Sequence, residues 1–239
     1  MSRKFFQAVI EDIPIWVRFD PVMREWDLGT SKCIIEGDEY RLKGFNQTDA
    51  QEHVRTVVDI GANIGAFTLM ARKMFPNARV FSIEPDPDNV ELLKRNTQDD
   101  PYVTVCPVAV LGDSCPNIAH FCRHNFNSGA GYVSEAFKEI DKPFEVVKQI
   151  PISCWSINNL FHEYDIDYID LLKVDTEGSE VEIFKCLVEH NWLPRICWIR
   201  FEWHGKHSIP ILRDLLSPTH EVSIIEEGDW NNFGIAHRK

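Results

Sequence analysis

The sequence lacks an excess of basic residues, a long apolar run and any closely paired cysteines. Lys and Arg total 25 against 37 Asp and Glu, which gives a formal net charge of −12. A charge of this sign repels polyphosphate, so we expect neither nucleic-acid nor membrane binding. No stretch of about 18 apolar residues occurs, so no segment is expected to span a bilayer. The seven cysteines are scattered and include no C-x-x-C pair, which is typical of a reducing compartment.

The chain also has no internal repeat, low-complexity tract or Gly/Ser linker. Its short basic start is followed by an apolar stretch that Glu11 and Asp12 interrupt, and no small-residue cleavage site follows. A secretory signal is therefore not expected. Hydrophobic residues make up 44% of the 239 positions and aromatic residues 11%, so the chain can bury a substantial core. We expect a soluble, cytoplasmic protein.

The first part of the chain, residues 1–53, predicts a β-rich appendage. Its short apolar runs, separated by Pro and Gly signals, predict strands over 5–10, 13–19 and 33–36. From residue 54 the pattern changes to alternating strands and helices. Strands are predicted over 57–60, 79–83 and 103–110, with helices over 64–75 and from Asp86 onward. This alternation indicates a doubly wound, Rossmann-like α/β domain with a mainly parallel sheet.

The second half of the chain completes this sheet after an insertion. Residues 114–153 are predicted to contain an inserted β-hairpin, with strands over 117–124 and 144–153. A fourth parallel strand follows over 169–174, and Ser179-x-x-Glu182 predicts a capping box that opens the next helix. The remaining predicted elements are a helix over 156–164, strands over 196–201, 221–225 and 233–237, and a helix over 210–216. We expect seven strands in residues 54–239, with the last two forming a hairpin at one edge.

The loop after the first parallel strand, Asp59 to Gly65, is the leading candidate for a cofactor site, because ligands of such sheets bind beyond the carboxyl ends of the strands. Gly61 permits a tight turn, and Gly65 permits close packing of the helix on the strand. A dinucleotide-binding loop has the pattern G-x-G-x-x-G, but Asn63 stands here at the middle glycine. The carboxylate of Asp59 opposes phosphate and favours an ammonium or sulfonium group, so S-adenosylmethionine (SAM) fits and NAD fits poorly. The alternative interpretation is an ordinary glycine turn with a helix-capping aspartate.

Polar residues after the next two strands extend this candidate site. Glu84 follows the second strand, where a carboxylate can accept from both ribose hydroxyls; the alternative is a solvated acid before a proline. Ala109 and Asp113 follow the third strand and can flank an adenine, with Asp113 accepting from its amino group. With Ala62 in the first loop, these residues complete the predicted cofactor-binding set.

Three motifs carry a resemblance to a known family: VVDIGANIGAFTLMA, FSIEPDPDNVELLKRN and IDLLKVDTEGSEVEIFKC. Over residues 54–205 the chain resembles the FkbM family of SAM-dependent methyltransferases. The resemblance implies a seven-stranded class I fold, SAM as methyl donor, and O-methylation of a small-molecule, natural-product or glycan acceptor. By this resemblance, the cofactor positions match Asp59, Gly61, Asn63, Gly65 and Glu84, and the signature beside the transfer site matches residues 173–178. The chain departs from the family pattern at Trp155-Ser156, where Leu-Asp is common.

Candidate bases for methyl transfer are Asp175, Glu177 and His204, which follow the fourth and fifth parallel strands. Alignment of the acceptor supplies about 7–11 kcal/mol, whereas a general base adds roughly 3–5 kcal/mol. The alternatives are a helix N-terminal charge for Glu177 and a hydrogen-bonding residue at the end of the sheet for His204. Asp175, Glu202 and His204 can also hold Mg²⁺, but a carboxylate–histidine hydrogen bond accounts for the same residue types, and no metal is expected.

The predicted hairpin raises two further possibilities. His120, Cys122 and His124 alternate along one strand and share a face, but no fourth zinc ligand is evident. The hairpin is also a candidate acceptor-binding lid, lined by Phe126, Tyr132 and Phe137; the alternatives are a surface insertion and a homodimer contact. Competing functions are a catalytically inactive SAM-binding scaffold and an NAD-linked oxidoreductase.

Overall fold

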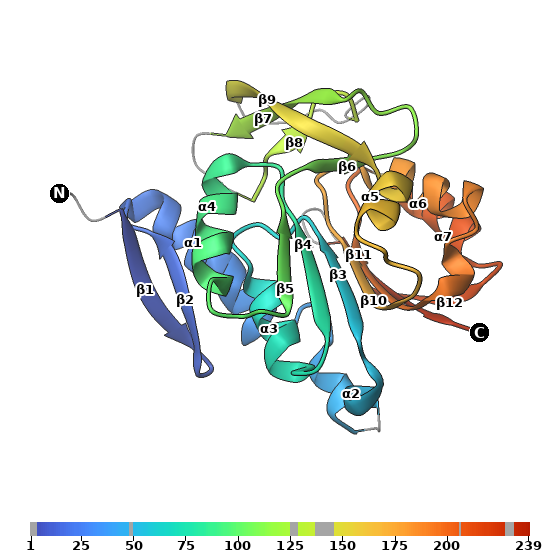
Figure 1. Cartoon of the computed structure of the whole chain (residues 1–239), viewed down its shortest axis with the longest axis horizontal. Coiled ribbons are helices and arrows are strands. Elements are labelled where there is room, and N and C mark those ends of the chain that lie inside the picture. Colours follow the sequence, from blue (N-terminus) through green and yellow to red (C-terminus); the bar gives the residue numbers. More distant parts are fainter. Residues whose placement is uncertain (1–3, 48–49, 125–128, 137–145, 206, 228–231) are drawn as a thin grey trace.

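The computed structural model describes residues 4–47, 50–124, 129–136, 146–205, 207–227 and 232–239. In this part of the chain, seven strands form one sheet in the order β12-β13-β11-β10-β3-β4-β5 (Figure 1). Five of them are parallel neighbours: β5 (Val103–Cys106), β4 (Arg79–Ile83), β3 (Thr56–Ile60), β10 (Ile169–Val174) and β11 (Ile196–Glu202). The other two, β13 (Asn232–Arg238) and β12 (His220–Glu227), are antiparallel and lie at one edge. The predicted doubly wound sheet and its edge hairpin are confirmed.

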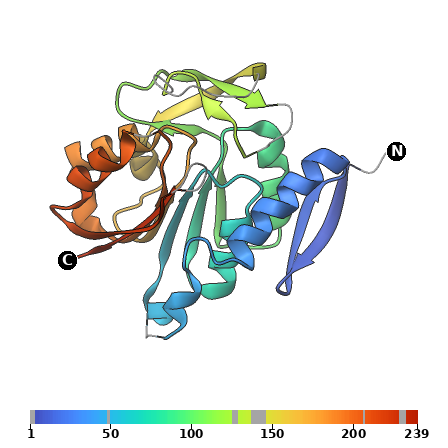
Figure 2. The ribbon, with the colours of Figure 1, turned by 180° about the vertical axis from the view of Figure 1, so that it is seen from behind.

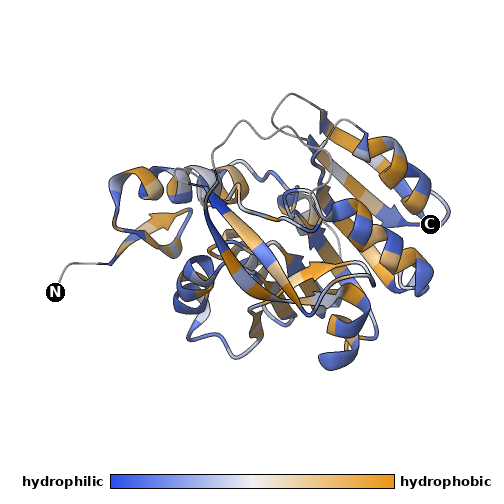
Figure 3. Ribbon diagram, turned by 90° about the horizontal axis from the view of Figure 1, so that it is seen from above, coloured by the Kyte–Doolittle hydropathy of each residue, from blue (hydrophilic) through white to orange (hydrophobic). Residues whose placement is uncertain are grey.

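The two faces of the sheet are covered by different helices, because successive side chains of a strand point to opposite faces. Val57, Val80 and Leu171 share one buried cluster with α3 (Ala66–Met74) and α4 (Pro87–Thr97). Their neighbours Val58, Phe81 and Leu172 share the other cluster with α5 (Ile157–Glu163), α6 (Glu180–Glu189) and α7 (Ser208–Leu216). The helices are banded hydrophilic and hydrophobic along their length, as expected for helices with one face on a core (Figure 3). No helix in the described ranges is long and apolar enough to cross a membrane.

Two predicted helix starts have different outcomes. Asp86 caps α4 as predicted, since its side chain accepts from the Asp88 amide at 2.8 Å and Pro87 follows. The predicted capping box at α6 is wrong: Ser179 makes no side-chain capping bond. The adjacent Glu180 instead binds the loop before the helix, where its Oε1 accepts from the amides of Thr176 and Gly178 at 3.0 and 3.1 Å.

The N-terminal residues form a hairpin and a long helix. β1 (Phe5–Ile10) and β2 (Ile13–Arg18) pair as predicted, but the strand predicted over 33–36 is wrong. Those residues end α1 (Pro21–Ile35), which begins after Asp20, whose side chain accepts from two amides at 3.1 Å. The Cys-Ile-Ile run is strand-like by composition, yet Ile34 and Ile35 are the buried last turn of a helix.

This N-terminal segment shares its core with the sheet. Ile15, Val17 and Leu42 belong to the same buried cluster as Val57 and Phe67. Helix α1 lies across the face that carries α3 (Figure 2), and a 3₁₀ turn (Lys43–Gln47) and α2 (Ala50–His53) lead into β3. The segment therefore packs on the same layer as the first βα unit.

The inserted residues form a second sheet. Its order is β6-β9-β7-β8, with β6 (Ala109–Leu111), β9 (Val146–Ser156), β7 (Ile118–His124) and β8 (Tyr132–Val133). The predicted antiparallel hairpin is the β7–β9 pair. The single strand predicted over 103–110 is divided at Pro107, because proline has no amide to continue the ladder. β6 therefore leaves the main sheet and pairs with β9, and the second sheet lies across one end of the main sheet (Figure 1).

Candidate active site

A cavity of about 440 Å³ lies at the carboxyl ends of the parallel strands, which is within the roughly 300–1,000 Å³ typical of small-molecule sites. The ends of β3, β4, β10 and β11 contribute Gly61, Asn63, Glu84, Asp175, Thr176, Glu177 and Glu202. The second sheet contributes Phe121 and Val133, and α1 contributes Trp26, Thr30 and Cys33. The cavity is therefore enclosed by three parts of the chain.

The two glycines of the first loop are held by different contacts. Gly61 has φ +81°, and a Cβ there would lie 1.7 Å from the Asp175 carbonyl oxygen, so the loop passes directly against the end of β10. Gly65 has φ +97°, and a Cβ there would lie 2.8 Å from Leu93 Cδ1. Gly65 thus permits packing of α3 on α4 rather than on the strand as predicted. The Gly61 and Ala62 amides both donate to the Ile83 carbonyl, at 3.0 and 2.9 Å, which fixes the loop to β4.

Asp59 lies beneath this loop rather than on the cavity wall. It is fully buried, accepts from Thr68 Oγ1 at 2.7 Å, and lies 3.3 Å from Lys173 Nζ. Burial raises the pKa of Asp59, and Lys173 opposes that rise. Lys173 is also buried and donates to the Gly61 carbonyl at 2.6 Å. The prediction that Asp59 attracts a sulfonium directly does not fit this placement, because its charge is already balanced below the loop.

Glu84 lines the cavity with its carboxylate partly satisfied. Its Oε2 accepts from the Asn63 amide at 2.8 Å, and its Oε1 accepts from the Asp86 amide and Asn89 Nδ2 at 2.9 and 3.2 Å. A carboxylate has about four acceptor positions, so about one remains, on Oε2. Glu84 therefore has capacity for one further hydroxyl rather than the predicted two. Burial raises the pKa of Glu84 to about 7.

Asn63 supplies the other polar group at this end of the cavity. Its φ is +51°, a conformation that asparagine tolerates better than most residues. Among the residues that the structure describes, its Oδ1 is buried and has no hydrogen-bond partner. Such an atom is costly unless a ligand or water satisfies it. Asn63 and Glu84 together thus offer two unused acceptors.

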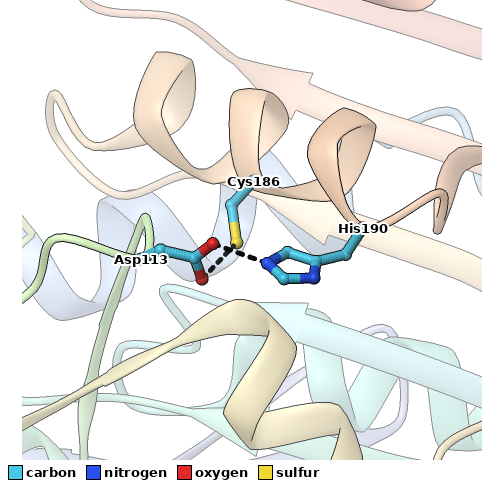
Figure 4. Close-up of side chains that lie close together, drawn as sticks. All are labelled: Asp113, Cys186 and His190. Carbon is cyan, nitrogen blue, oxygen red and sulfur yellow. Dashed lines mark hydrogen bonds and ion pairs between the residues drawn. The ribbon is translucent and has the colours of Figure 1, made fainter.

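Of the two predicted residues after the third strand, Ala109 lines the cavity and Asp113 does not. Asp113 lies against α6, where its Oδ2 is 2.5 Å from His190 Nε2 and its Oδ1 accepts from the Cys186 thiol at 3.3 Å (Figure 4). The prediction that Asp113 contacts an adenine does not fit this placement. The cause is the turn at Pro107, which directs β6 into the second sheet.

The predicted catalytic residues meet beyond the ends of β10 and β11, which lie on the other side of β3 from β4. Asp175 and Glu177 line the cavity, whereas His204 is not among its lining residues. Asp175 Oδ2 accepts from Tyr40 Oη at 2.8 Å and lies 3.3 Å from Lys173 Nζ. His204 Nε2 lies 3.5 Å from both Glu177 Oε2 and Glu202 Oε1. The structure thus brings all three predicted bases, Asp175, Glu177 and His204, into one cluster together with Glu202.

The charges of this cluster push its pKa values apart. Burial raises the pKa of Asp175, but Lys173 and His204 outweigh burial and leave that pKa below its ordinary value. Burial and the charge of Asp175 raise the pKa of Glu202 well above its ordinary value. Burial opposes the imidazolium of His204, but Glu177 and Glu180 hold its pKa well above the usual range. In the absence of a ligand, these shifts favour the ionised form of Asp175 and the protonated forms of Glu202 and His204.

Tyr40 and Glu39 are among the cavity residues that were not predicted from the sequence. Tyr40 is buried, with its ring edge-on to Phe67 and Phe233 at centroid distances of 5.3 and 5.6 Å. Glu39 lines the same wall, where burial and Asp175 raise its pKa to about 7. Both lie in the N-terminal segment, outside the recognised motifs, so no sequence signal connected them to the strand ends.

The second sheet contributes to the cavity in part as predicted. Phe121, Gly131 and Val133 line it, but Tyr132 does not, and the predicted lining residues Phe126 and Phe137 lie outside the described residues. The trio His120, Cys122 and His124 forms no metal-ligand group among the described residues. His120 instead lies 2.9 Å from Glu135, and the Cys122 sulfur accepts from Gln149.

Comparisons with known proteins show which proteins this chain resembles. The model of the methyltransferase FkbM domain matches residues 59–221. The chain is 26% identical over 162 residues to Methyltransferase sdnD of Sordaria araneosa, covering 57% of this chain and 61% of that protein. It is 23% identical over 148 residues to Methyltransferase 1 of Beauveria bassiana (strain ARSEF 2860), covering 57% of this chain and 59% of that protein. The chain thus spans about three fifths of the length of these curated relatives.

A solved structure shares the fold. The SAM-dependent methyltransferase from Agrobacterium tumefaciens superposes with a TM-score of 0.55 at 9% identity, covering all of this chain and 71% of that one. At this identity the likeness shows the fold alone. The family-domain match covers more than half of the chain and includes the ends of β3, β4, β10 and β11 that line the cavity. The chain therefore belongs to the methyltransferase FkbM family.

Proposed function

We propose that this protein uses SAM to methylate a hydroxyl oxygen of a small-molecule, natural-product or glycan acceptor. The observation that carries the proposal is the division of the cavity into two chemically different ends. One end presents the unused acceptors of Glu84 and Asn63. The other end presents Asp175, Glu177 and Glu202.

The first end fits a nucleoside. Glu84 Oε2 and Asn63 Oδ1 can each accept from one hydroxyl of a ribose diol, which would satisfy the orphaned amide oxygen. Val108 and Ala109 follow β5, the neighbour of the strand that carries Glu84, and supply apolar wall for a flat base. When bound, SAM supplies an electrophilic methyl group on a sulfonium centre.

The second end fits a hydroxyl acceptor. Lys173 favours the ionised form of Asp175, which accepts hydrogen bonds, and the raised pKa of Glu202 favours its protonated form, which donates one. A hydroxyl group can donate to Asp175 and accept from Glu202 at the same time, which fixes the direction of its remaining lone pair. Glu177 and Asp175 are the groups available to take the hydroxyl proton, because His204 is already protonated when no ligand is bound.

Calorimetric titration of SAM into the wild type and single variants tests the first end. Glu84→Ala and Asn63→Ala are expected to weaken SAM binding at least tenfold. The matched control is Asp113→Asn, a predicted cofactor residue that lies outside the cavity, and its SAM affinity is expected to equal that of the wild type. A wild type that binds no SAM, or a loss of binding in Asp113→Asn alone, contradicts the proposal.

Turnover with a panel of alcohol, phenol, carboxylate and amine acceptors tests the second end. We expect S-adenosylhomocysteine to form with a hydroxyl acceptor that gains one methyl mass, and Asp175→Asn to abolish this product while leaving SAM bound. Methylation of amines alone contradicts the hydroxyl assignment. SAM binding without turnover on any acceptor supports the inactive-scaffold alternative instead.

A further inference from the structure

The acceptor end of the cavity has the geometry of a cation site. Asp175, Glu202 and His204 place one ligand atom each within 4.8 Å of one another. His204 Nε2 is 3.5 Å from Glu202 Oε1 and from Glu177 Oε2. These separations exceed the ~2.7–3.2 Å of an N–H···O hydrogen bond. They are close to the roughly 3.4 Å between two ligands that each lie about 2.1 Å from one tetrahedral metal ion.

The other nitrogen of His204 is anchored as in a metal-binding histidine. Nδ1 lies 3.0 Å from Oε1 of Glu180, which is buried. The same oxygen accepts from the amides of Thr176 and Gly178 and from Thr176 Oγ1, at 3.0, 3.1 and 3.1 Å. The oxygen is therefore held in place by donors from the loop. A carboxylate that accepts a hydrogen bond from Nδ1–H fixes the tautomer and points Nε2 at the metal. Here Nε2 points at Glu177 and Glu202.

The charge around these atoms also favours a cation. One oxygen of Asp175 and one of Glu202 lie within 4.8 Å of each other. Lys173 Nζ lies 3.3 Å from Asp175, and His204 Nε2 lies 3.5 Å from Glu202. Two close carboxylates repel one another, and a cation between them removes that repulsion.

We propose that Asp175, Glu202 and His204 bind a divalent cation. Two carboxylates and one imidazole form a donor set between the oxygen-only sites of Mg²⁺ and the nitrogen- and sulfur-rich sites of zinc, which favours an ion of the Mn²⁺ or Fe²⁺ type. Binding of the ion does not depend on SAM. Its role rests on the proposed function: an ion beside the acceptor would hold the acceptor oxygen and lower the pKa of its hydroxyl.

A second ligand cluster in the described residues provides an internal control. Asp113, Cys186 and His190 also place ligand atoms within 4.8 Å of one another, but there the groups satisfy each other directly. Asp113 bonds to both partners (Figure 4), and burial raises the pKa of the Cys186 thiol to about 12, so that it stays protonated. This cluster has no carboxylate–histidine anchor of the kind that Glu180 gives His204.

The experiment is a titration of the full chain with Mn²⁺ after removal of metals by a chelator, with neither SAM nor acceptor present. Electron paramagnetic resonance of free Mn²⁺ gives the affinity. We expect one saturable site with micromolar affinity, at least tenfold weaker binding in Glu202→Gln and His204→Gln, and unchanged binding in Asp113→Asn and His190→Gln. Glu180→Gln keeps every ligand and is expected to weaken binding about 10- to 100-fold.

Spectroscopy of the bound ion separates a ligand from a merely structural residue. Bound Mn²⁺ is expected to show spin-echo coupling to one imidazole nitrogen, lost in His204→Gln and kept in His190→Gln. Thermal unfolding of each variant checks that the fold is intact, and Glu202→Gln serves if His204→Gln does not fold. Absence of saturable binding below millimolar Mn²⁺ overturns the proposal, as does binding lost in His190→Gln alone.

The same variants keep this inference apart from the proposed function. His204→Gln leaves Glu84 and Asn63 untouched and is expected to bind SAM as the wild type does. A wild type that binds Mn²⁺ but no SAM supports the cation site and contradicts the proposed function. A wild type that binds SAM and methylates an acceptor with no Mn²⁺ site contradicts the cation site alone.

Discussion

Replacing Lys173 with methionine tests the charge balance below the first loop. Lys173 is 2% exposed, and its Nζ lies 3.3 Å from an oxygen of Asp59 and 3.3 Å from an oxygen of Asp175. Methionine retains most of the aliphatic volume but removes the charge and the hydrogen bond to the Gly61 carbonyl. Breaking a buried ion pair by removing one partner costs about 3–5 kcal/mol. For a domain of this size, that corresponds to a fall in Tm of roughly 6–20 °C.

Urea unfolding of Lys173→Met at several pH values measures the effect. Burial holds the pKa of Asp59 above its unfolded value, and loss of Lys173 raises it further. At pH values above the pKa that Asp59 has in the unfolded state, the ionised Asp59 carboxylate therefore destabilises the folded state. This destabilisation decreases as the pH falls below the pKa that Asp59 has in the folded state. We expect a larger deficit relative to the wild type at pH 8 than at pH 5.

Two variants serve as controls for this result. The double variant Lys173→Met/Asp59→Asn is expected to recover most of the lost free energy, because no buried charge is left at position 59. Lys185→Met removes an exposed lysine that lies 3.6 Å from Glu182 and is expected to change stability by less than about 0.5 kcal/mol. A Lys173→Met variant whose free energy of unfolding at pH 8 lies within 1 kcal/mol of the wild type would refute the reasoning, since that is only about one fifth to one third of the expected loss. A double variant that is no more stable than the single variant would also refute it.

Three further predictions follow from the cavity. Gly61→Ala is expected to lower the free energy of unfolding by about 2–4 kcal/mol, because the new methyl clashes with the end of β10 and φ is positive. The control Gly29→Ala has open space around its Cβ and is expected to raise the free energy of unfolding by up to about 1 kcal/mol. Equal unfolding midpoints for the two variants would contradict this. The pKa of Glu84 is raised to about 7, so near neutral pH the folded state binds a proton that the unfolded state has lost. The stability of the wild type relative to Glu84→Gln is therefore expected to fall as pH rises from 5 to 8. A stability difference that does not change with pH in chemical unfolding counts against this prediction. Tyr40→Phe removes the hydroxyl that donates to Asp175 at 2.8 Å. It is expected to lower kcat/KM about tenfold or more and to leave SAM affinity unchanged. A weakened SAM affinity in calorimetry speaks against a role of Tyr40 in positioning Asp175.

The central sheet was predictable because its signals are local. Buried strands of β-branched residues alternate with helices that begin at marked positions such as Asp86, and this alternation permits few topologies. The topology predicts which residues follow the strand ends. Four of these residues line one cavity in the structure: Gly61, Asn63, Glu84 and Asp175. Local pattern and global arrangement agree here.

The remaining features depend on contacts between distant residues. Nothing local distinguishes the end of α1 from a strand, because burial of Ile34 and Ile35 is decided by α3 and the sheet. Asp113 was misplaced because a single proline sends β6 into another sheet. The pattern Ser179-x-x-Glu182 predicts a capping box, but the local sequence does not show that Glu177 and Gly178 adopt positive φ or that the Gly178 amide donates to Glu180.

The bonds of Tyr40 have a consequence for the order of folding. Its hydroxyl bonds to a residue 135 positions later, and its carbonyl accepts from Arg200 Nε, 160 positions later, at 2.7 Å. Contacts of such separation form late, because a long loop must close before any of them contributes. During synthesis, Tyr40 leaves the ribosome well before Asp175 and Arg200, so neither bond can form until those residues have been made. In refolding experiments, the capacity to bind a ligand should therefore return only in the slowest phase.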